Sequence, residues 1–115
     1  MSEWVSFVKS RIETTDQMQK SYYMTYERKA GLLVLTNTKL MFIEEKGFLR
    51  KTHDLIMELP YKKIKTITVE SASQLSILDS EGKKHIFASQ GAIPVSPVIV
   101  EEAIRGQMPI QGAIP

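Results

Sequence analysis

Residues 31–44 read GLLVLTNTKLMFIE, and this stretch decides the fold. Two apolar runs, residues 32–35 and 40–43, flank the polar segment 36–39. Apolar runs bounded by turn formers predict two β-strands, and Asn37 tolerates the backbone conformation of a tight turn. A hairpin with one face in water alternates apolar and polar side chains, but both faces of this one are apolar. We therefore predict a β-hairpin that is covered on both sides.

Further short strands are predicted around this hairpin. Alternating or aromatic-rich segments separated by turn formers predict five of them, at residues 21–27, 51–59, 64–70, 74–78 and 83–89. With the hairpin, this makes seven short strands joined by tight turns. Such a pattern is typical of a small barrel or sandwich.

One helix is predicted on each side of the strands. Residues 2–20 have an amphipathic pattern, with Ser2 as the N-cap. Ser96 and the proline after it begin a second helix, which we expect to end at Arg105 because Gly106 suits the position just past a helix end. Both helices are expected to pack on the strands, since short helices need tertiary contacts.

These elements divide the chain of 115 residues into three parts. Residues 1–20 are the N-terminal helix, residues 21–106 are a barrel with its closing helix, and residues 107–115 are an extended tail. The sequence QGAIP occurs twice, at residues 90–94 and 111–115, and no prediction is based on it. The length fits a single domain with its own core.

The composition excludes several classes of function. The 15 basic and 13 acidic residues give a net charge of +2, which is too balanced for a nucleic-acid-binding protein. The absence of cysteine excludes disulfides and thiolate chemistry. No apolar run approaches the roughly 18 residues of a membrane-spanning helix, and the early Glu3 argues against a signal peptide. We expect a cytoplasmic protein that is at most peripheral to a membrane.

No sequence pattern indicates catalysis. The chain has no nucleophile motif, no Gly-rich phosphate loop and no metal-ligand spacing. His53 and His85 are distant in sequence and have no carboxylate cluster beside them, so we interpret both as solvated strand histidines. We predict that the protein is not an enzyme, has no cofactor or metal, and has no small-molecule substrate.

The hairpin motif and the segments after it resemble a known family. Residues 31–42 match the pattern GxLxLTNxRLxF, with Lys39 in the usual position of arginine. Residues 59–67 resemble the pattern IPLxxIxxV, and residues 75–87 resemble a closing hairpin. Over residues 21–106 the chain thus resembles GRAM domains and bacterial pleckstrin-homology-like (PH-like) domains. The resemblance implies a mainly β fold, in which a PH-like barrel of seven antiparallel strands forms two near-orthogonal sheets capped by a C-terminal helix.

In this fold, alternate hairpin side chains point into the barrel and away from it. The inward set would be Leu33, Leu35, Leu40 and Phe42. By alternation, the other four point outward and need a cover, because an apolar patch of this size is rarely bare on a monomer. Either the N-terminal helix or a partner chain could cover them. The candidate interaction surface consists of Leu32, Val34, Met41 and Ile43 of the hairpin, with Trp4 and Val8 of the helix.

A second candidate site is implied by the resemblance. PH-type folds bind anionic headgroups among their strand connections. By position, those connections here contain the candidate basic residues Arg28, Lys29, Lys46, Arg50, Lys51, Lys83 and Lys84. Acidic residues lie in the same loops and would cancel much of the positive electrostatic field of these basic residues. The competing interpretation is therefore that these basic residues belong to ordinary solvated turns and bind no ligand.

Two binding functions follow from these sites. The first is a non-catalytic interaction module that acts through protein–protein contact or self-association. The alternative is a peripheral binder of anionic lipid headgroups, of the phosphoinositide type, that uses the basic loops at the open barrel end. We favour the first function, because the apolar face of the hairpin is a stronger indication in the sequence than the nearly balanced charge.

Overall fold

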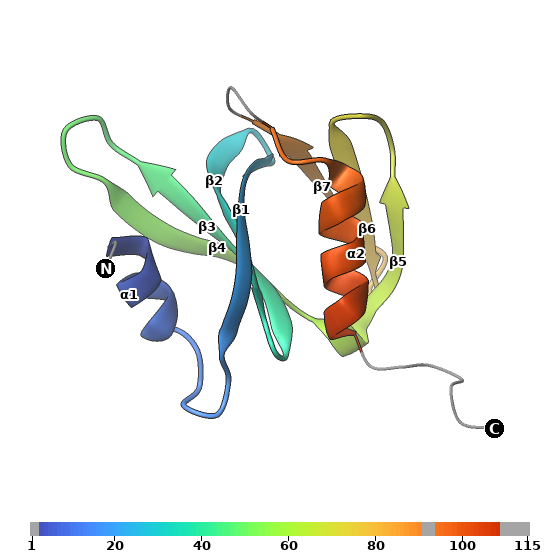
Figure 1. Cartoon of the computed structure of the whole chain (residues 1–115), viewed down its shortest axis with the longest axis horizontal. Coiled ribbons are helices and arrows are strands. Elements are labelled where there is room, and N and C mark those ends of the chain that lie inside the picture. Colours follow the sequence, from blue (N-terminus) through green and yellow to red (C-terminus); the bar gives the residue numbers. More distant parts are fainter. Residues whose placement is uncertain (1–2, 91–93, 109–115) are drawn as a thin grey trace.

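The computed structural model describes residues 3–90 and 94–108 (Figure 1). Within these residues the helices are α1 (Glu3–Lys9), the short 3-10 helix η1 (Tyr61–Lys63) and α2 (Pro97–Gln107). The strands are β1 (Met18–Tyr26), β2 (Lys29–Thr36), β3 (Lys39–Lys46), β4 (Thr52–Pro60), β5 (Ile64–Val69), β6 (Gln74–Asp79) and β7 (Lys84–Ser89). The prediction of a mainly β fold with seven strands and a helix near each end is confirmed. The second QGAIP copy lies outside the described residues, as does most of the first.

All seven strands belong to one antiparallel sheet in the order β4-β3-β2-β1-β7-β6-β5. β1 pairs with β2 along its whole length, but with β7 only through residues 24–26. In Figure 1, β2, β3 and β4 lie on one side of β1, whereas β5, β6, β7 and α2 lie on the other. We expected two near-orthogonal sheets. Hydrogen bonds through β1 instead join the strands into one sheet.

β2 and β3 form the predicted hairpin. Its inward side chains are fully buried, as expected: Leu33, Leu35, Leu40 and Phe42. A Cβ at position 31 would lie 2.0 Å from the carbonyl oxygen of Ile43, so only glycine fits there. This contact explains the glycine at the start of the motif.

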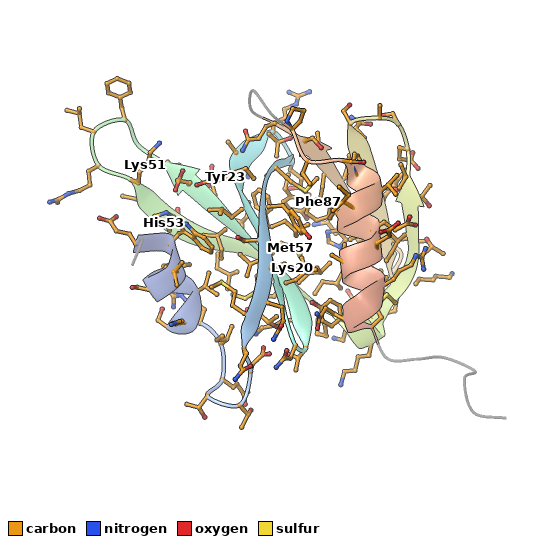
Figure 2. The ribbon with its side chains drawn as sticks, in the orientation of Figure 1. Lys20, Tyr23, Lys51, His53, Met57 and Phe87 are labelled. Atoms are coloured by element: carbon orange, nitrogen blue, oxygen red, sulfur yellow. The ribbon has the colours of Figure 1, made fainter. Side chains whose placement is uncertain are left out.

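The inner face of the sheet packs against α2. Val100 and Ile104 of α2 are fully buried in the same cluster as the inward hairpin residues. Tyr26 and Phe87 stack with their ring centroids 5.1 Å apart, and Phe87 lies on the side of the sheet near α2 (Figure 2). α2 therefore closes this core, as the resemblance implies.

α2 begins as predicted but ends later. The Ser96 hydroxyl accepts a hydrogen bond from the Val98 amide at 3.3 Å, which confirms the N-cap. The predicted end at Arg105 is wrong, because α2 continues to Gln107 and the amide of Met108 still donates to the carbonyls of Ile104 and Arg105. Gly106 thus lies inside the last turn.

The outer face of the hairpin is covered by the N-terminal segment. Val8 of α1 joins the four outward hairpin residues in a second buried cluster. Around it pack Trp4, Phe7, Ile12, Met18 and Leu55. Of the two covers considered from sequence, the structure contains the intramolecular one.

The predicted N-terminal helix is too long. α1 stops at Lys9, and Met18 already belongs to β1, where it pairs with Thr36. Thr14, Thr15 and Asp16 are poor helix formers that favour turns and caps. The side chain of Asp16 binds the β2–β3 turn instead of continuing a helix.

Candidate functional site

The predicted basic residues form two groups rather than one rim. Lys83 of the β6–β7 turn pairs with Glu27 of the β1–β2 turn at 3.6 Å, and Arg28 and Lys84 line one shallow hollow. Lys46, Arg50 and Lys51 lie instead at the end of the β3–β4 hairpin. Figure 1 shows this hairpin projecting away from the β1–β2 turn. The seven cations therefore do not surround a single ligand.

Several of these cations already have acidic partners. At the β3–β4 hairpin, Lys46 lies 3.3 Å from Asp54 and Lys51 lies 4.0 Å from Glu45. Lys84 lies 3.7 Å from Glu70. Among the residues that the structure describes, the predicted cations without an ion pair are Arg28, Lys29 and Arg50. Exposed pairs of this kind contribute only about 0–1 kcal/mol each.

The end of the β3–β4 hairpin carries an apolar feature that the sequence analysis missed. Phe48 and Leu49 are each 94% exposed, more than any other large apolar side chain described. Gly47 has a φ of +109°, and a Cβ there would lie 2.0 Å from the carbonyl oxygen of Arg50. The glycine permits a tight turn that holds both apolar side chains away from the sheet. We call Phe48 and Leu49 the apolar tip.

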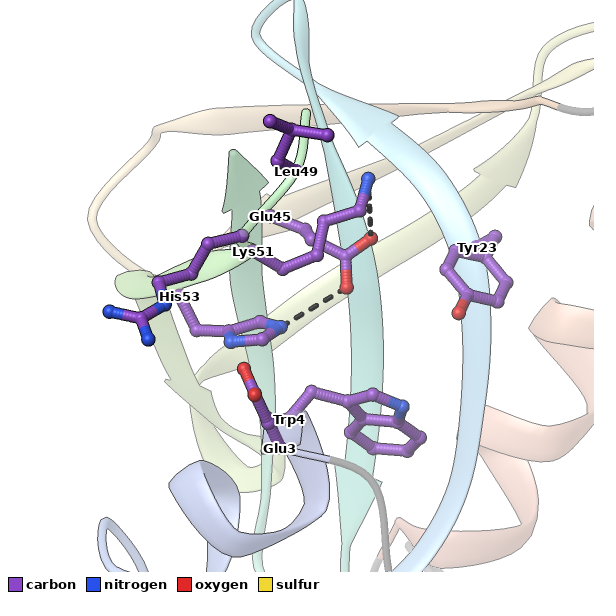
Figure 3. A pocket seen from close by; sticks show the side chains of 8 residues that line it. Glu3, Trp4, Tyr23, Glu45, Leu49, Lys51 and His53 are labelled. Atoms are coloured by element: carbon purple, nitrogen blue, oxygen red, sulfur yellow. Dashed lines mark hydrogen bonds and ion pairs between the residues drawn. The ribbon is translucent and has the colours of Figure 1, made fainter. Parts of the chain in front are cut away.

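A hollow of about 480 Å³ lies beside the apolar tip (Figure 3). α1, β1 and the β3–β4 hairpin all contribute to it. Its lining residues are Glu3, Trp4, Tyr23, Glu45, Leu49, Arg50, Lys51 and His53. Figure 2 shows Tyr23, Lys51 and His53 gathered between α1 and the hairpin end. The hollow thus continues the outer face of the sheet beyond the cover supplied by α1.

The histidines are not solvated, contrary to the sequence-based interpretation. The side chain of His53 is 6% exposed, and its Nε2 lies 3.1 Å from a carboxylate oxygen of Glu45. His85 is buried, with Nδ1 2.8 Å from the Tyr26 hydroxyl and Nε2 2.9 Å from Asp79. Sequence spacing did not indicate these partners, since they come from neighbouring strands.

The predicted interaction surface is mostly inaccessible in this structure. Leu32, Val34, Met41 and Ile43 have exposed fractions of 0–1%, and Val8 of α1 is equally buried above them. Trp4 is partly buried at the edge of this cluster, where it also lines the hollow. A partner could reach the four hairpin residues only if α1 left.

The part of the chain that the structure describes contains neither a cluster of metal-ligating side chains nor a helix that could cross a membrane. There, no group of three or more His, Cys, Asp or Glu side chains is placed to hold a metal ion. The helices in those residues are also too short or too polar to cross a membrane.

Comparison with known families agrees with this architecture. A family model described as Bacterial PH domain matches residues 5–91. The chain belongs to this bacterial PH domain family. No curated protein matches the chain. PH-like domains typically mediate interactions and are generally non-catalytic binding modules. The narrower likeness to GRAM domains stays a prediction.

The PH domain therefore offers two surfaces with different chemistry. The hollow of Arg28 and Lys84 is lined by both charge signs and by Ile86. The β3–β4 hairpin combines the apolar tip, three cations and the larger hollow. Exposed apolar side chains that adjoin cations are typical of an interaction site, so the hairpin is the stronger candidate.

Proposed function

We propose that this PH domain is a non-catalytic interaction module that attaches reversibly to a membrane surface through the apolar tip. The observation that carries the proposal is the 94% exposure of both Phe48 and Leu49. An exposed pair of this kind is unfavourable in water and gains free energy in the acyl region of a bilayer. The proposal places the domain at the membrane periphery.

The expected strength of this contact is modest. Burial of both side chains contributes about 3–6 kcal/mol, at about 1.5–3 kcal/mol each. That is comparable to a single myristoyl chain, which gives marginal and reversible membrane binding. We therefore expect an attachment that needs a second signal for stability.

The cations beside the tip supply part of that second signal. Each basic residue near an anionic surface contributes about 1 kcal/mol. Arg50 has no ion pair within the described residues, whereas Lys46 and Lys51 face Asp54 and Glu45. The acidic partners reduce the electrostatic gain. Anionic lipid should strengthen binding without being required for it.

We rank the two functions expected from sequence in the opposite order. Protein contact through the outer face ranks lower, because α1 covers that face. A phosphoinositide-type clamp of seven cations is also less favoured, since the cations form two separate groups. The lipid alternative is retained in a different form, with the hairpin end as the contact.

Vesicle co-sedimentation tests this proposal. We expect the full chain to bind phosphatidylcholine vesicles weakly and vesicles containing phosphatidylglycerol more strongly. The double variant F48S/L49S should lose binding to both. The matched control is V98S/I99S, which removes two adjacent apolar residues of α2 that are each about half exposed.

Two results would overturn the proposal. One is equal vesicle binding by F48S/L49S and the wild type. The other is the absence of vesicle binding combined with concentration-dependent self-association that F48S/L49S abolishes. The second result would assign the apolar tip to protein contact.

A further inference from the structure

The hollow beside the apolar tip has a chemistry that membrane attachment alone does not use. Aromatic rings from Trp4 and Tyr23 line it, together with the carboxylates of Glu3 and Glu45. Tyr23 pairs with Leu32, an outward residue, so its ring lies on the outer face of the sheet. A purely hydrophobic anchor requires none of these carboxylates. The hollow therefore points to a ligand with a positive group.

Aromatic walls and carboxylates together favour a cation. A ring attracts a cation within about 6 Å of its centroid, and tryptophan does so best. Glu3 has no ion pair within residues 3–90 and 94–108, so its carboxylate is available to a ligand. Glu45 already contacts His53 and Lys51, which fixes its position in the hollow.

Cations also line the hollow. Arg50 and Lys51 follow the tip directly in sequence, and both belong to the lining. The positive charges of these two residues balance the negative charges of Glu3 and Glu45 in the lining. A purely anionic ligand would meet two carboxylates, and a purely cationic one would meet two basic side chains. A zwitterion meets complementary charge at both ends.

The order of these groups matches that of a phospholipid. Figure 3 shows Leu49 at one end of the hollow, Glu45 and Lys51 in the middle, and Trp4 with Glu3 at the other end. A zwitterionic phospholipid presents acyl chains, then a phosphate, then an amine. With the tip among the acyl chains, the phosphate would lie near Arg50 and Lys51. The amine would then reach Trp4 and Glu3.

We infer that this hollow binds the headgroup of a zwitterionic phospholipid, with an amine of the ethanolamine or choline type. The ammonium lies between Trp4 and Tyr23 near Glu3, and the phosphate contacts Arg50 and Lys51. The inference rests on the proposed membrane attachment, because the tip defines which end of the hollow faces the bilayer. It adds a preference for one type of headgroup to a membrane contact that would otherwise depend only on apolar burial and charge.

Soluble headgroup compounds test the hollow without a membrane. Trp4 is the single tryptophan of the chain, so intrinsic fluorescence reports directly on the hollow. We would titrate the full chain with glycerophosphocholine, glycerophosphoethanolamine and glycerol phosphate. The first two should give a saturable change, whereas glycerol phosphate, which lacks the amine, should give none.

Variants identify the groups responsible. Y23A should weaken binding about tenfold, whereas Y23F keeps the ring and should bind as the wild type does. Tyr23 is 54% exposed, so the fold tolerates its truncation. E3Q should also weaken binding, and E102Q, an exposed glutamate on α2, is its matched control.

The outcomes separate this inference from the proposed function. F48S should still bind the soluble compounds, because Phe48 does not line the hollow. Tip-dependent vesicle binding without any response to the soluble amines would overturn the headgroup site and leave membrane attachment standing. Equal responses to glycerol phosphate and the amines would overturn it as well, since the hollow would then be a phosphate site. A response to the amines without vesicle binding would refute the attachment and reassign the hollow to free phosphodiesters.

Discussion

The carboxylate of Asp16 accepts a hydrogen bond from the hydroxyl of Thr38 at 2.8 Å. Its other oxygen accepts bonds from the amides of Asn37 at 3.0 Å and Gln17 at 2.9 Å. One buried side chain thus connects the segment after α1 to the β2–β3 turn. This connection holds α1 in register over the outer face of the hairpin.

We predict that D16A lowers the free energy of unfolding by about 1–3 kcal/mol, because three donors lose a charged acceptor. Chemical denaturation measures the loss. D54A is the matched control: Asp54 forms an exposed pair with Lys46, so its removal should change stability by less than about 1 kcal/mol. Similar losses in the two variants would show that Asp16 is not a structural connection.

The same carboxylate makes stability depend on pH. Burial opposes ionisation of Asp16, but the hydrogen bonds from the Thr38 hydroxyl and from the amides of Gln17 and Asn37 outweigh it. The pKa of Asp16 is therefore lowered below the usual 3.8. A lowered pKa in the folded state gives stability that is present above pH 3.8 and is lost as the pH falls through the folded pKa. D16N should show a weaker loss of stability in this acidic range. An unchanged pH profile would contradict the assignment.

Val8 provides a direct test of the cover over the outer face. We predict that V8D releases α1, lowers stability by roughly 2–4 kcal/mol and causes self-association. The reason is that the four outward hairpin residues lose their cover and expose a contiguous apolar patch. Light scattering over a range of concentrations measures the mass. V98D, at a half-exposed position of α2, should remain a monomer.

A stable V8D monomer would show that the hairpin tolerates exposure of this face. An oligomeric wild type would instead indicate that α1 and a partner chain share the cover. Either result would return the outer face to the list of candidate interaction surfaces.

The hairpin was predictable because its pattern leaves few alternatives. Strands that are apolar on both faces must be buried on both, so the sequence already required a second cover for Leu32 and Ile43. Local residues also marked the α2 N-cap at Ser96. The same kind of local signal failed at Gly106, because α2 continues through the glycine to Gln107.

Features that depend on tertiary placement were missed. In sequence, Phe48 and Leu49 are an ordinary apolar pair before the predicted strand at residues 51–59. Only the structure, with the positive φ of Gly47, shows that they project outward. His53 and His85 find carboxylate partners through strand register, which the sequence did not reveal. Likewise, the sequence placed seven cations in strand connections but could not show that the β3–β4 hairpin projects away from the others.

We predict that His85 carries a hydrogen on Nε2, because this nitrogen lies 2.9 Å from the carboxylate of Asp79, which can only accept. Its Nδ1 lies 2.8 Å from the Tyr26 hydroxyl. Nitrogen chemical shifts from NMR identify the tautomer. An imidazole without a hydrogen on Nε2 would contradict this arrangement.

Removal of the ring should affect its two partners differently. In H85F the buried Tyr26 hydroxyl loses its hydrogen-bond partner, which costs about 1–3 kcal/mol. The hydrogen bond from His85 is the largest cause that lowers the pKa of Asp79, followed by the amide of Lys83. H85F should therefore raise the pKa of Asp79 towards 3.8 without restoring it fully. A carboxyl titration by NMR measures the shift, and an unchanged pKa would show that the backbone amides alone hold the carboxylate.

The β1–β2 turn combines backbone strain with a candidate basic residue. Glu27 and Arg28 have φ values of +51° and +68°, in the two-residue turn between the paired residues Tyr26 and Lys29. Such turns favour Asn-Gly, because side chains with a Cβ are strained in the left-handed region. We predict that R28G raises the free energy of unfolding by about 1 kcal/mol, whereas K29G, within the strand, lowers it by about 0.5–1 kcal/mol. Chemical denaturation compares them, and a destabilised R28G would show that Arg28 makes a contact worth more than the strain. If R28G is stabilised but binds anionic vesicles less well than the wild type, the strained arginine is explained by binding rather than by folding.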